Sequence, residues 1–506
     1  SYPHSWRSKA PLIYRATPQW FISMEKKSLR NKAIKAIGDT TFYPPKGKER
    51  LLSMIEGRPD WCISRQRSWG VPLPIFINKK TKEPLRDQKV IDRIAKIYEE
   101  EGSDCWFTDE PKRFLSENYN ADDYEKLTDI VEVWFDSGST HSFVLEKRED
   151  LKWPADMYLE GSDQHRGWFH SSLLESCGTR GRAPFDSILS HGFVVDGKGM
   201  KMSKSAGNVI APDDILKNYG ADILRAWVAS SDYAEDLRID NTILAQHAES
   251  YRKIRNTFRF ILGNLQDKFE PQDFKKINID NFSELEKYIL GKIAYLDDSI
   301  KENLKSYNYH KLYKELSNFC TLDLSSFYFD IRKDLLYCDD LESKKRKDCI
   351  AVLNIILECL LKWLAPIFVF TTEEIYDLLN KNNNSIHELL FPDVPQNWKN
   401  DSLNKKWKNL FEIKEQVNIA IEEKRASKEI GSSLEADILI NVNEKNFKLL
   451  DELDLEEYFI TSKAKKIHST TEDKIKIEVK KSIGIKCRLC WKILEKKCTR
   501  KHCGIN

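Results

Sequence analysis

The chain has 506 residues, of which 41% are hydrophobic, and it carries 81 basic and 79 acidic side chains. At roughly 100–200 residues per domain, this length predicts about three to five domains, each with a hydrophobic core. The balanced charge excludes a polycation, so any contact with nucleic acid must use local basic patches.

The sequence also argues against a membrane or secreted protein. It contains no run of about 18 or more apolar residues, and its N-terminal residues lack the apolar core of a signal peptide. Seven of the eleven cysteines are scattered singly, which is typical of reduced, buried thiols. We therefore expect a cytoplasmic protein that makes no contact with a membrane.

Residues 1–235 are rich in Trp, Pro and Gly. Short apolar runs at 156–161 and 187–197 predict strands, and the segment 168–178 between them predicts a helix. This alternation is typical of a parallel α/β sheet. The more polar segment from about 71 to 128 is expected to be an insertion within that domain.

Residues 236–400 predict a helical bundle, because apolar residues recur at helical spacing over 293–304 and 352–364. Thr371 and Glu374 match a capping box for a further helix.

Beyond residue 400, a long helix is expected to run as far as Gly431. The alternating segments 436–442 and 474–479 then predict strands of a small mixed domain.

The stretch DGKGMKMSKSAGN, residues 196–208, places Lys198, Lys201 and Lys204 among three glycines. One interpretation is a solvated basic turn. The other is a mobile phosphate clamp, because glycine permits unusual backbone conformations and lysine neutralises charge that develops on transferring phosphates. Spacing alone leaves both interpretations open.

Four cysteines crowd into the end of the chain with the spacing C-x2-C-x7-C-x4-C, and they are Cys487, Cys490, Cys498 and Cys503. Two close pairs of thiols predict a tetrahedral zinc site. Two disulfides or four free thiols are the alternatives. The segment 481–506 also holds eight Lys or Arg residues and one acidic residue, which predicts a phosphate-binding patch.

Several longer stretches carry a resemblance to a known family. The letters KMSKS at 201–205 resemble the second signature of the class I aminoacyl-tRNA synthetases. The stretches that resemble the isoleucyl-tRNA synthetase family are WCISRQRSWGVPLP (61–74), EVWFDSGSTH (132–141), YLEGSDQHRGWF (158–169), GADILRAWVAS (220–230), SYRKIRNTFRFILGN (250–264), SSFYFDIRKDLLYC (325–338) and EKRASKEIGSSLEA (423–436). The resemblance covers essentially the whole chain.

The resemblance implies a fold of α/β plus all-α class. It predicts the second half of a Rossmann-type catalytic domain, an α-helical anticodon-binding bundle, a small mixed α+β region and a zinc module. The expected bounds are 1–60 for the exit of an editing insertion and the return to the catalytic domain, 61–235 for the catalytic domain with its insertion at about 71–128 and its KMSKS loop at 201–205, 236–400 for the bundle, 401–480 for the mixed region and 481–506 for the zinc module.

The resemblance also implies roles for individual residues. Lys201 and Lys204 would face the departing pyrophosphate as catalytic residues, with Lys204 as the essential contact to ATP. Lys198 would lie on the surface. The residues expected to contact the aminoacyl-adenylate are Glu160, Gly161, Asp163 and Gln164, with Trp134 and Trp168 against the isoleucine side chain and His191 near the adenine. The alternatives are a helix start capped by Ser162 and Asp163, core tryptophans and a structural histidine.

By the same resemblance the substrates are L-isoleucine and ATP, accompanied by Mg²⁺, and the partner is isoleucine tRNA. One Zn²⁺ is expected at the C-terminal end, as in the bacterial type. The second cysteine pair departs from the family's usual spacing, so that His502 could replace Cys503 as the fourth ligand. Basic residues on the 250–264 stretch are expected to contact tRNA, with a solvated helix face as the alternative; they are Arg252, Lys253, Arg255 and Arg259.

The first class I signature, His-x-Gly-His, does not occur ahead of these motifs. We therefore expect a C-terminal portion of a synthetase, monomeric or completed by a missing N-terminal half. The alternative is a tRNA-binding fragment without catalysis. A generic phosphate-binding α/β protein would leave residues 236–506 unexplained.

Overall fold

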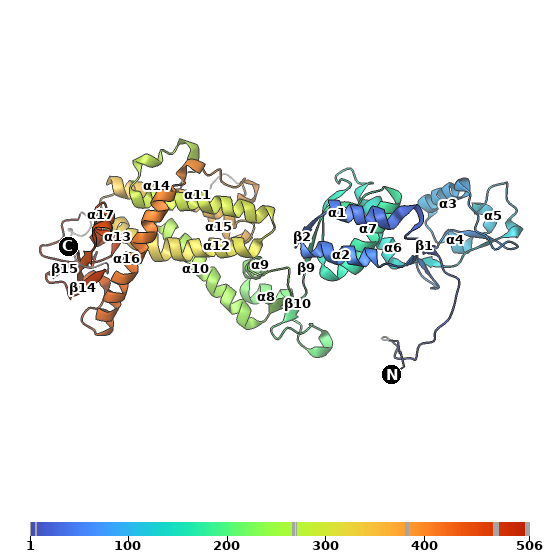
Figure 1. Cartoon of the computed structure of the whole chain (residues 1–506), viewed down its shortest axis with the longest axis horizontal. Coiled ribbons are helices and arrows are strands. Elements are labelled where there is room, and N and C mark those ends of the chain that lie inside the picture. The colour runs from blue at the N-terminus through green and yellow to red at the C-terminus, as the bar shows by residue number, and fades with distance from the viewer. Residues whose placement is uncertain are drawn as a thin grey trace. The chain divides into compact units, whose positions relative to one another are not determined.

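The computed structural model describes residues 2–5, 8–265, 269, 271–379, 384–468 and 475–500. The chain forms two compact units, residues 1–193 with 234–236 and residues 194–233 with 237–506 (Figure 1). None of the helices that the structure describes combines the length and apolar character needed to cross a lipid bilayer.

A three-stranded parallel sheet with the order β2-β9-β8 lies at the centre of the first unit. Its core joins Phe42 of the sheet to Phe169 and Leu173 of helix α7, all nearly fully buried. The elements around this core are β2 (Thr41–Tyr43), β8 (Ala155–Gly161), β9 (Phe185–His191), α1 (Leu29–Asp39), α2 (Lys46–Glu56), α6 (Val133–Gly138) and α7 (Trp168–Thr179). The strands and the helix expected between residues 156 and 197 are confirmed.

The segment expected to be an insertion has a small core of its own, built around Phe76, Trp106 and Phe114. Its elements are β5 (Phe76–Asn78), α3 (Gln88–Glu101), α4 (Cys105–Thr108), α5 (Pro111–Phe114) and β6 (Tyr124–Lys126). Two short antiparallel pairs flank it, β1 (Phe21–Ile22) with β3 (Trp61–Cys62) and β4 (Ser64–Arg65) with β7 (Ile130–Val131).

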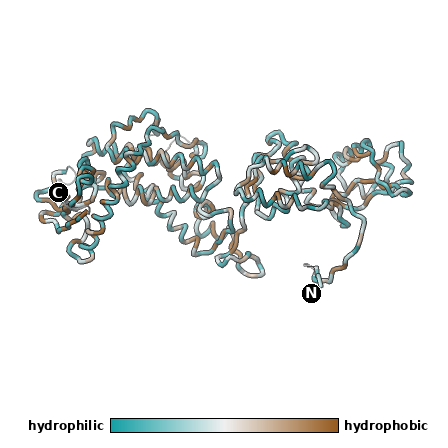
Figure 2. The backbone as a smooth tube through the Cα atoms, in the orientation of Figure 1, coloured by the Kyte–Doolittle hydropathy of each residue, from teal (hydrophilic) through white to brown (hydrophobic). Residues whose placement is uncertain are grey.

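The second unit begins with a parallel pair, β10 (Val194–Asp196) and β11 (Leu237–Ile239), and with helices α8 (Pro212–Tyr219) and α9 (Ala221–Ser230). A helical bundle follows (Figure 1). Its elements are α10 (Asn241–Leu265), α11 (Glu284–Lys305), α12 (Tyr309–Asn318), the π-helical segment Phe319–Tyr328, α13 (Phe329–Cys338), α14 (Lys344–Leu364), α15 (Val369–Leu379) and α16 (Asp401–Ala426). Hydrophobic segments run through the bundle and hydrophilic ones follow its outer loops (Figure 2).

Two helix boundaries differ from those expected. Thr371 lies inside α15 and caps nothing. Its backbone N–H and its hydroxyl instead donate to the Asp222 carboxylate, at 2.8 and 2.6 Å, so a side chain from α9 satisfies the start of α15. Helix α16 ends at Ala426, and the left-handed residue after it is Lys428, at φ +60°, rather than Gly431. The capping-box and helix-stop predictions were wrong at these positions.

A small three-stranded sheet completes the described part of the second unit, with β12 (Ala436–Val442) between β13 (Lys463–His468) and β14 (Lys476–Lys481). The two alternating segments are thus confirmed as strands. Helices α17 (Glu444–Leu449) and α18 (Leu455–Tyr458) lie between β12 and β13, and the hairpin β15 (Ile485–Lys486) with β16 (Ile493–Leu494) follows. The succession of a parallel α/β part, a bundle and a mixed region confirms the expected fold class, while the domain bounds stay predictions.

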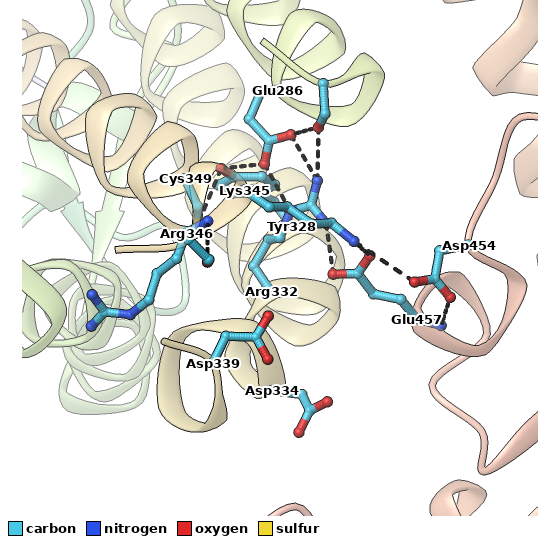
Figure 3. A network of polar contacts seen from close by, with 12 residues as sticks. Glu286, Tyr328, Arg332, Asp334, Asp339, Lys345, Arg346, Cys349, Asp454 and Glu457 are labelled. Atoms are coloured by element: carbon cyan, nitrogen blue, oxygen red, sulfur yellow. Dashed lines mark hydrogen bonds and ion pairs between the residues drawn. The ribbon is translucent and has the colours of Figure 1, made fainter. Parts of the chain in front are cut away.

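A buried ionic network connects the bundle to this mixed region (Figure 3). Arg332 of α13 is only 3% exposed, and it donates to both carboxylate oxygens of Glu286 on α11, at 2.7 Å each. Its remaining terminal nitrogen donates to Glu457 of α18, also at 2.7 Å. Lys345 of α14 also forms an ion pair with Glu457. One cation thus connects three helices.

We predict that Arg332→Ala lowers the free energy of unfolding of the second unit by about 3–5 kcal/mol, because it leaves the buried Glu286 carboxylate without its counterion. Urea denaturation followed by far-ultraviolet circular dichroism measures this change. Arg252→Ala is the matched control, since the Arg252–Glu249 pair is exposed and pairs of that kind contribute at most about 1 kcal/mol. Equal effects of the two substitutions would contradict the importance of the network.

Candidate functional site

The carboxyl ends of two neighbouring parallel strands bring several of the expected residues together. Gly161 ends β8 and His191 ends β9, and the two are partners in the strand register. A Cβ atom on Gly161 would lie 2.7 Å from Asp163 Oδ1 and 3.8 Å from His191 Cε1, so glycine permits this close approach. Ligands of open parallel sheets bind beyond such strand ends.

The polar groups at this edge retain capacity for a ligand. Glu160 and Asp163 are both exposed, and the Glu160 carboxylate accepts from the backbone N–H of Gly161, at 3.2 Å. The Nδ1 atom of His191 lies 2.8 Å from the Gly192 carbonyl oxygen. A neutral imidazole that donates through Nδ1 presents Nε2 as an acceptor. Carboxylates and an acceptor nitrogen suit an ammonium group, ribose hydroxyls or an adenine amino group.

Gln164 has a structural role that the sequence did not reveal. Its Oε1 atom accepts from the backbone N–H of Trp168 at 2.9 Å, which caps the first turn of α7. The short 3-10 turn Ser162–Arg166 has no side-chain cap, so the alternative of capping by Ser162 and Asp163 was wrong. Gln164 lies beside the strand-end residues, and its other polar atom, Nε2, donates to Asp163 Oδ2 at 3.3 Å.

The two tryptophans expected against an aliphatic side chain lie near each other on α6 and α7. Trp168 stacks on Tyr158, with centroids 4.0 Å apart and planes at 4°. Its indole N–H donates to the Ser137 carbonyl oxygen at 3.0 Å. The Trp134 ring is 41% exposed, and a Cβ on Gly167 would lie only 2.8 Å from its Cη2. Both tryptophans therefore lie at the start of α7.

Two acidic residues of α6 and α7, Asp136 and Glu175, were missed by the sequence analysis. Glu175 of α7 is 9% exposed, and its Oε1 atom has no hydrogen-bond partner among the described residues. Burial, and secondarily the charge of Asp136, raises the pKa of Glu175 from 4.5 to about 9. Burial also raises the pKa of Asp136. A single acidic residue inside the apolar segment 168–178 was the signal that could have pointed to this group.

The lysine-bearing loop 196–208 belongs to the second unit. Asp196 organises it, because its Oδ1 atom accepts from the backbone N–H groups of Lys198 and Met200, at 3.0 and 2.8 Å. Asn208 donates to Asp196 Oδ2 at 2.9 Å and accepts from the Ser203 N–H at 2.9 Å. The hydrogen bond from Asn208, followed by that from Met200, lowers the pKa of Asp196.

The lysine side chains take no part in these hydrogen bonds. Lys198, Lys201 and Lys204 are all exposed. Gly199 and Gly207 adopt left-handed conformations, with φ of +81° and +65°, which explains glycine at these two turns. The loop thus presents several cations on a backbone fixed by polar side chains at its two ends.

Three of the four expected metal ligands lie together. The Sγ atoms of Cys487, Cys490 and Cys498 are all within 4.8 Å of one another, and the last two residues are buried. This set could hold a metal ion. Cys503 and His502, the candidates for the fourth ligand, lie outside the described residues.

The basic residues expected to contact tRNA lie along α10, and all are exposed: Arg252, Lys253, Arg255 and Arg259. Arg252 pairs with Glu249 at 2.6 Å. The exposure fits a nucleic-acid surface and equally a solvated helix face.

Comparisons with known proteins agree with the motifs. Residues 7–240 match the family described as tRNA synthetases class I (I, L, M and V), and residues 286–440 match the family described as the anticodon-binding domain of tRNA ligase.

Relatives named isoleucine–tRNA ligase align with nearly the whole chain. That of Pelagibacter ubique is 65% identical, covering 99% of this chain and 55% of the relative. Those of Mesorhizobium japonicum and Zymomonas mobilis are 47% and 46% identical, covering 91% and 98% of this chain and 47% and 53% of the relatives. The chain therefore spans about half the length of these relatives.

Solved structures support the fold. The LeuRS of Agrobacterium radiobacter K84, in a ternary complex with tRNA and LeuAMS, is similar with a TM-score of 0.50 and 18% identity, over 76% of this chain and 44% of that one. The methionyl-tRNA synthetase of Mycobacterium tuberculosis in complex with methionyl-adenylate gives a TM-score of 0.53 and 16% identity, over 76% of this chain and 67% of that one.

We predict that Glu175→Gln raises the free energy of unfolding of the first unit, and that this difference from the parent protein increases with pH. The folded carboxyl keeps its proton up to about pH 9, whereas in the unfolded chain it ionises near its ordinary value of 4.5. The contribution of Glu175 to stability is therefore fully present below pH 4.5 and is lost as pH rises towards 9. Glutamine does not ionise in either state.

Thermal unfolding of both proteins between pH 5 and pH 9 measures the difference. The variant's advantage in Tm should grow steadily across this range. A difference that stays constant with pH would show that Glu175 is ionised in the folded protein.

Proposed function

The chain belongs to the class I aminoacyl-tRNA synthetases, and on that premise we propose that it carries the second part of the catalytic domain, the tRNA-binding bundle and the C-terminal region of an isoleucine–tRNA ligase. The main observation behind this proposal is the juxtaposition of Gly161, Asp163 and His191 at adjacent strand ends, in a chain whose sequence follows isoleucine–tRNA ligases nearly throughout.

The proposed reaction has two steps. The carboxylate of L-isoleucine attacks the α-phosphorus of ATP, the bond to the bridging oxygen breaks, and isoleucyl-adenylate and pyrophosphate form. A terminal ribose hydroxyl of isoleucine tRNA then attacks the isoleucyl carbonyl carbon, which releases AMP and leaves the amino acid esterified to the tRNA. Mg²⁺ accompanies ATP and neutralises part of its charge.

Positioning and electrostatics are the protein's proposed contributions. The Glu160 and Asp163 carboxylates bind the ammonium group and ribose hydroxyls of the adenylate, and His191 lies at the adenine. The aromatic pair Trp134 and Trp168 borders the branched side chain of isoleucine.

The exposed lysines of the loop meet the pyrophosphate. Lys204, supported by Lys201, neutralises negative charge that grows on the leaving group as the α-phosphorus is attacked. Such a contact stabilises the transition state more than the bound substrate, so it accelerates the reaction.

Isoleucine tRNA is the proposed macromolecular partner. The exposed cations of α10 and the basic segment 481–500 would contact its phosphates, so that binding would weaken with salt as counterions are released. A translation enzyme of this kind works in the cytoplasm, and we propose a monomer.

We also propose that the three clustered thiols, completed by Cys503, hold one Zn²⁺. The short segment 485–500 has a small core made largely of cysteine side chains, so the metal would supply folding energy that packing does not. Cys487, Cys490 and Cys498 would act as thiolate ligands.

We predict that Lys204→Ala lowers the rate of isoleucine-dependent ATP–pyrophosphate exchange by about 100- to 1000-fold, or roughly 2.7–4 kcal/mol, with little change in isoleucine affinity. The experiment uses the chain joined to the preceding half of the Pelagibacter ubique ligase. Lys198→Ala, an exposed lysine of the same loop, is the control and should retain the rate. The chain alone should exchange poorly, because it lacks His-x-Gly-His.

Three outcomes would contradict parts of the proposal. The absence of isoleucine-dependent exchange in the joined protein would favour a tRNA-binding fragment without catalysis. An unchanged rate for Lys204→Ala would mean that the lysines form a surface loop. Full exchange by the chain alone would show that the other half is not needed.

We predict about one Zn²⁺ per chain in protein purified under reducing conditions. Elemental analysis should show its loss in Cys498→Ser and its retention in Cys62→Ser, which changes a half-buried thiol outside the cluster. Cys503→Ser should release the metal and His502→Ala should not; the reverse would identify His502 as the fourth ligand. A folded C-terminal segment without zinc would refute the site.

A further inference from the structure

Helix α6 packs unusually closely on helix α7 at Gly138. A Cβ atom at this position would lie 2.2 Å from Glu175 Oε1 and 3.0 Å from Ser171 Oγ, both on α7. The Glu175 carboxyl is buried and its Oε1 is unpartnered among the described residues, so this oxygen lies directly against the backbone of α6.

The backbone of Gly138 does not itself require glycine. Its φ lies outside the left-handed region, and alanine is more favourable than glycine within a helix. An added side chain at residue 138 would therefore have to displace the buried Glu175 carboxyl.

The same contact fixes the position of the aromatic pair. Trp134 lies one helical turn before Gly138 on α6, and its ring covers Gly167 at the start of α7. Ser137, next to Gly138, supplies the carbonyl oxygen that accepts from the Trp168 indole. A movement of α6 away from α7 at Gly138 would therefore displace Trp134 and remove the hydrogen bond that orients Trp168.

We infer that the contact between Gly138 and Glu175 positions the two tryptophans proposed to border the amino acid. The backbone of α6 fits against the buried Glu175 carboxyl, and this fit sets the spacing of Trp134 and Trp168 for a branched aliphatic side chain. Neither residue touches the substrate. The part of this inference that concerns isoleucine rests on the proposed function, whereas the part that concerns packing does not.

The packing is tested on the chain itself by hydrogen exchange with mass spectrometry of peptides covering residues 130–145. Gly138→Ala should speed exchange of α6 by about tenfold or more, because the added methyl group separates the two helices. Gly138→Ala combined with Glu175→Ala should return exchange towards that of Glu175→Ala alone. Gly138→Ala combined with Glu175→Gln should not, because glutamine fills the same space.

Gly178→Ala is the matched control on α7, since a Cβ there would make only an ordinary contact, 3.7 Å from Leu29 Cδ1. It should leave exchange of 130–145 unchanged. Slower exchange in Gly138→Ala would overturn the inference, because helix propensity would then outweigh any clash. If Gly138→Ala fails to fold, recovery by Glu175→Ala supports the contact, and failure of the double variant as well refutes it.

The consequence for the pocket is measured in the joined protein. Gly138→Ala should raise the KM for isoleucine in ATP–pyrophosphate exchange by about tenfold or more and reduce the preference for isoleucine over valine, with a smaller effect on the KM for ATP. Adding Glu175→Ala should partly restore the isoleucine KM. An unchanged isoleucine KM in Gly138→Ala, while the parent protein exchanges normally, would refute the inference and leave the proposed function intact.

Discussion

The buried guanidinium of Arg332 is the contact on which the arrangement of the second unit depends (Figure 3). A charge taken out of water costs several kcal/mol unless its hydrogen bonds are made well. Here Glu286 accepts through both carboxylate oxygens and Glu457 through one, all at 2.7 Å. Because Glu457 belongs to α18, the small mixed region can approach the bundle closely only in a position where that carboxylate reaches the cation. An apolar interface would tolerate sliding, whereas this pairing does not. The surfaces proposed to bind tRNA, α10 and the basic C-terminal segment, are thereby held on one body.

In the first unit, glycine residues rather than a buried ion pair allow the elements to pack closely. Gly161 lets Asp163 and His191 approach a strand end, Gly167 lies under the Trp134 ring, and Gly138 lies against Glu175. Each contact brings the backbone close to an aromatic ring or a polar side chain. Close packing of this kind would help to position the two tryptophans that we propose border the isoleucine side chain. One methylene separates isoleucine from valine, and a hydrophobic pocket distinguishes the two by only about 1–3 kcal/mol, a limit for which isoleucyl-tRNA synthetases are themselves the established example.

Sequence reasoning succeeded where a pattern is local and failed where a partner is distant. The strand at 155–161 and the strand at 185–191 followed from short apolar runs, and parallel pairing then required Gly161 and His191 to meet at one edge. Thr371 matched a capping box, yet the group that satisfies α15 is Asp222, from a helix far earlier in the chain. Gln164 resembled a ligand contact by family motif, and its bond to the Trp168 N–H depends on a turn that the motif does not specify. Glu175 stood out only as one acid in an apolar helix, and its neighbours Asp136 and Gly138 became evident only when α6 was seen against α7.

The loop 196–208 is ordered by hydrogen bonds that do not involve the ammonium groups of its lysines. Asp196 and Asn208 fix the backbone of 196–208 through carboxylate, amide and N–H groups. None of those hydrogen bonds involves an ammonium group of Lys201 or Lys204, and both lysines are exposed. A lysine already paired with a carboxylate would have to break that pair before it met a phosphate, and the lost attraction would offset the new one. With the ordering assigned to Asp196 and Asn208, the two lysines remain available for the pyrophosphate that we propose they contact. The left-handed glycines at 199 and 207 supply the turns on either side of the two lysines.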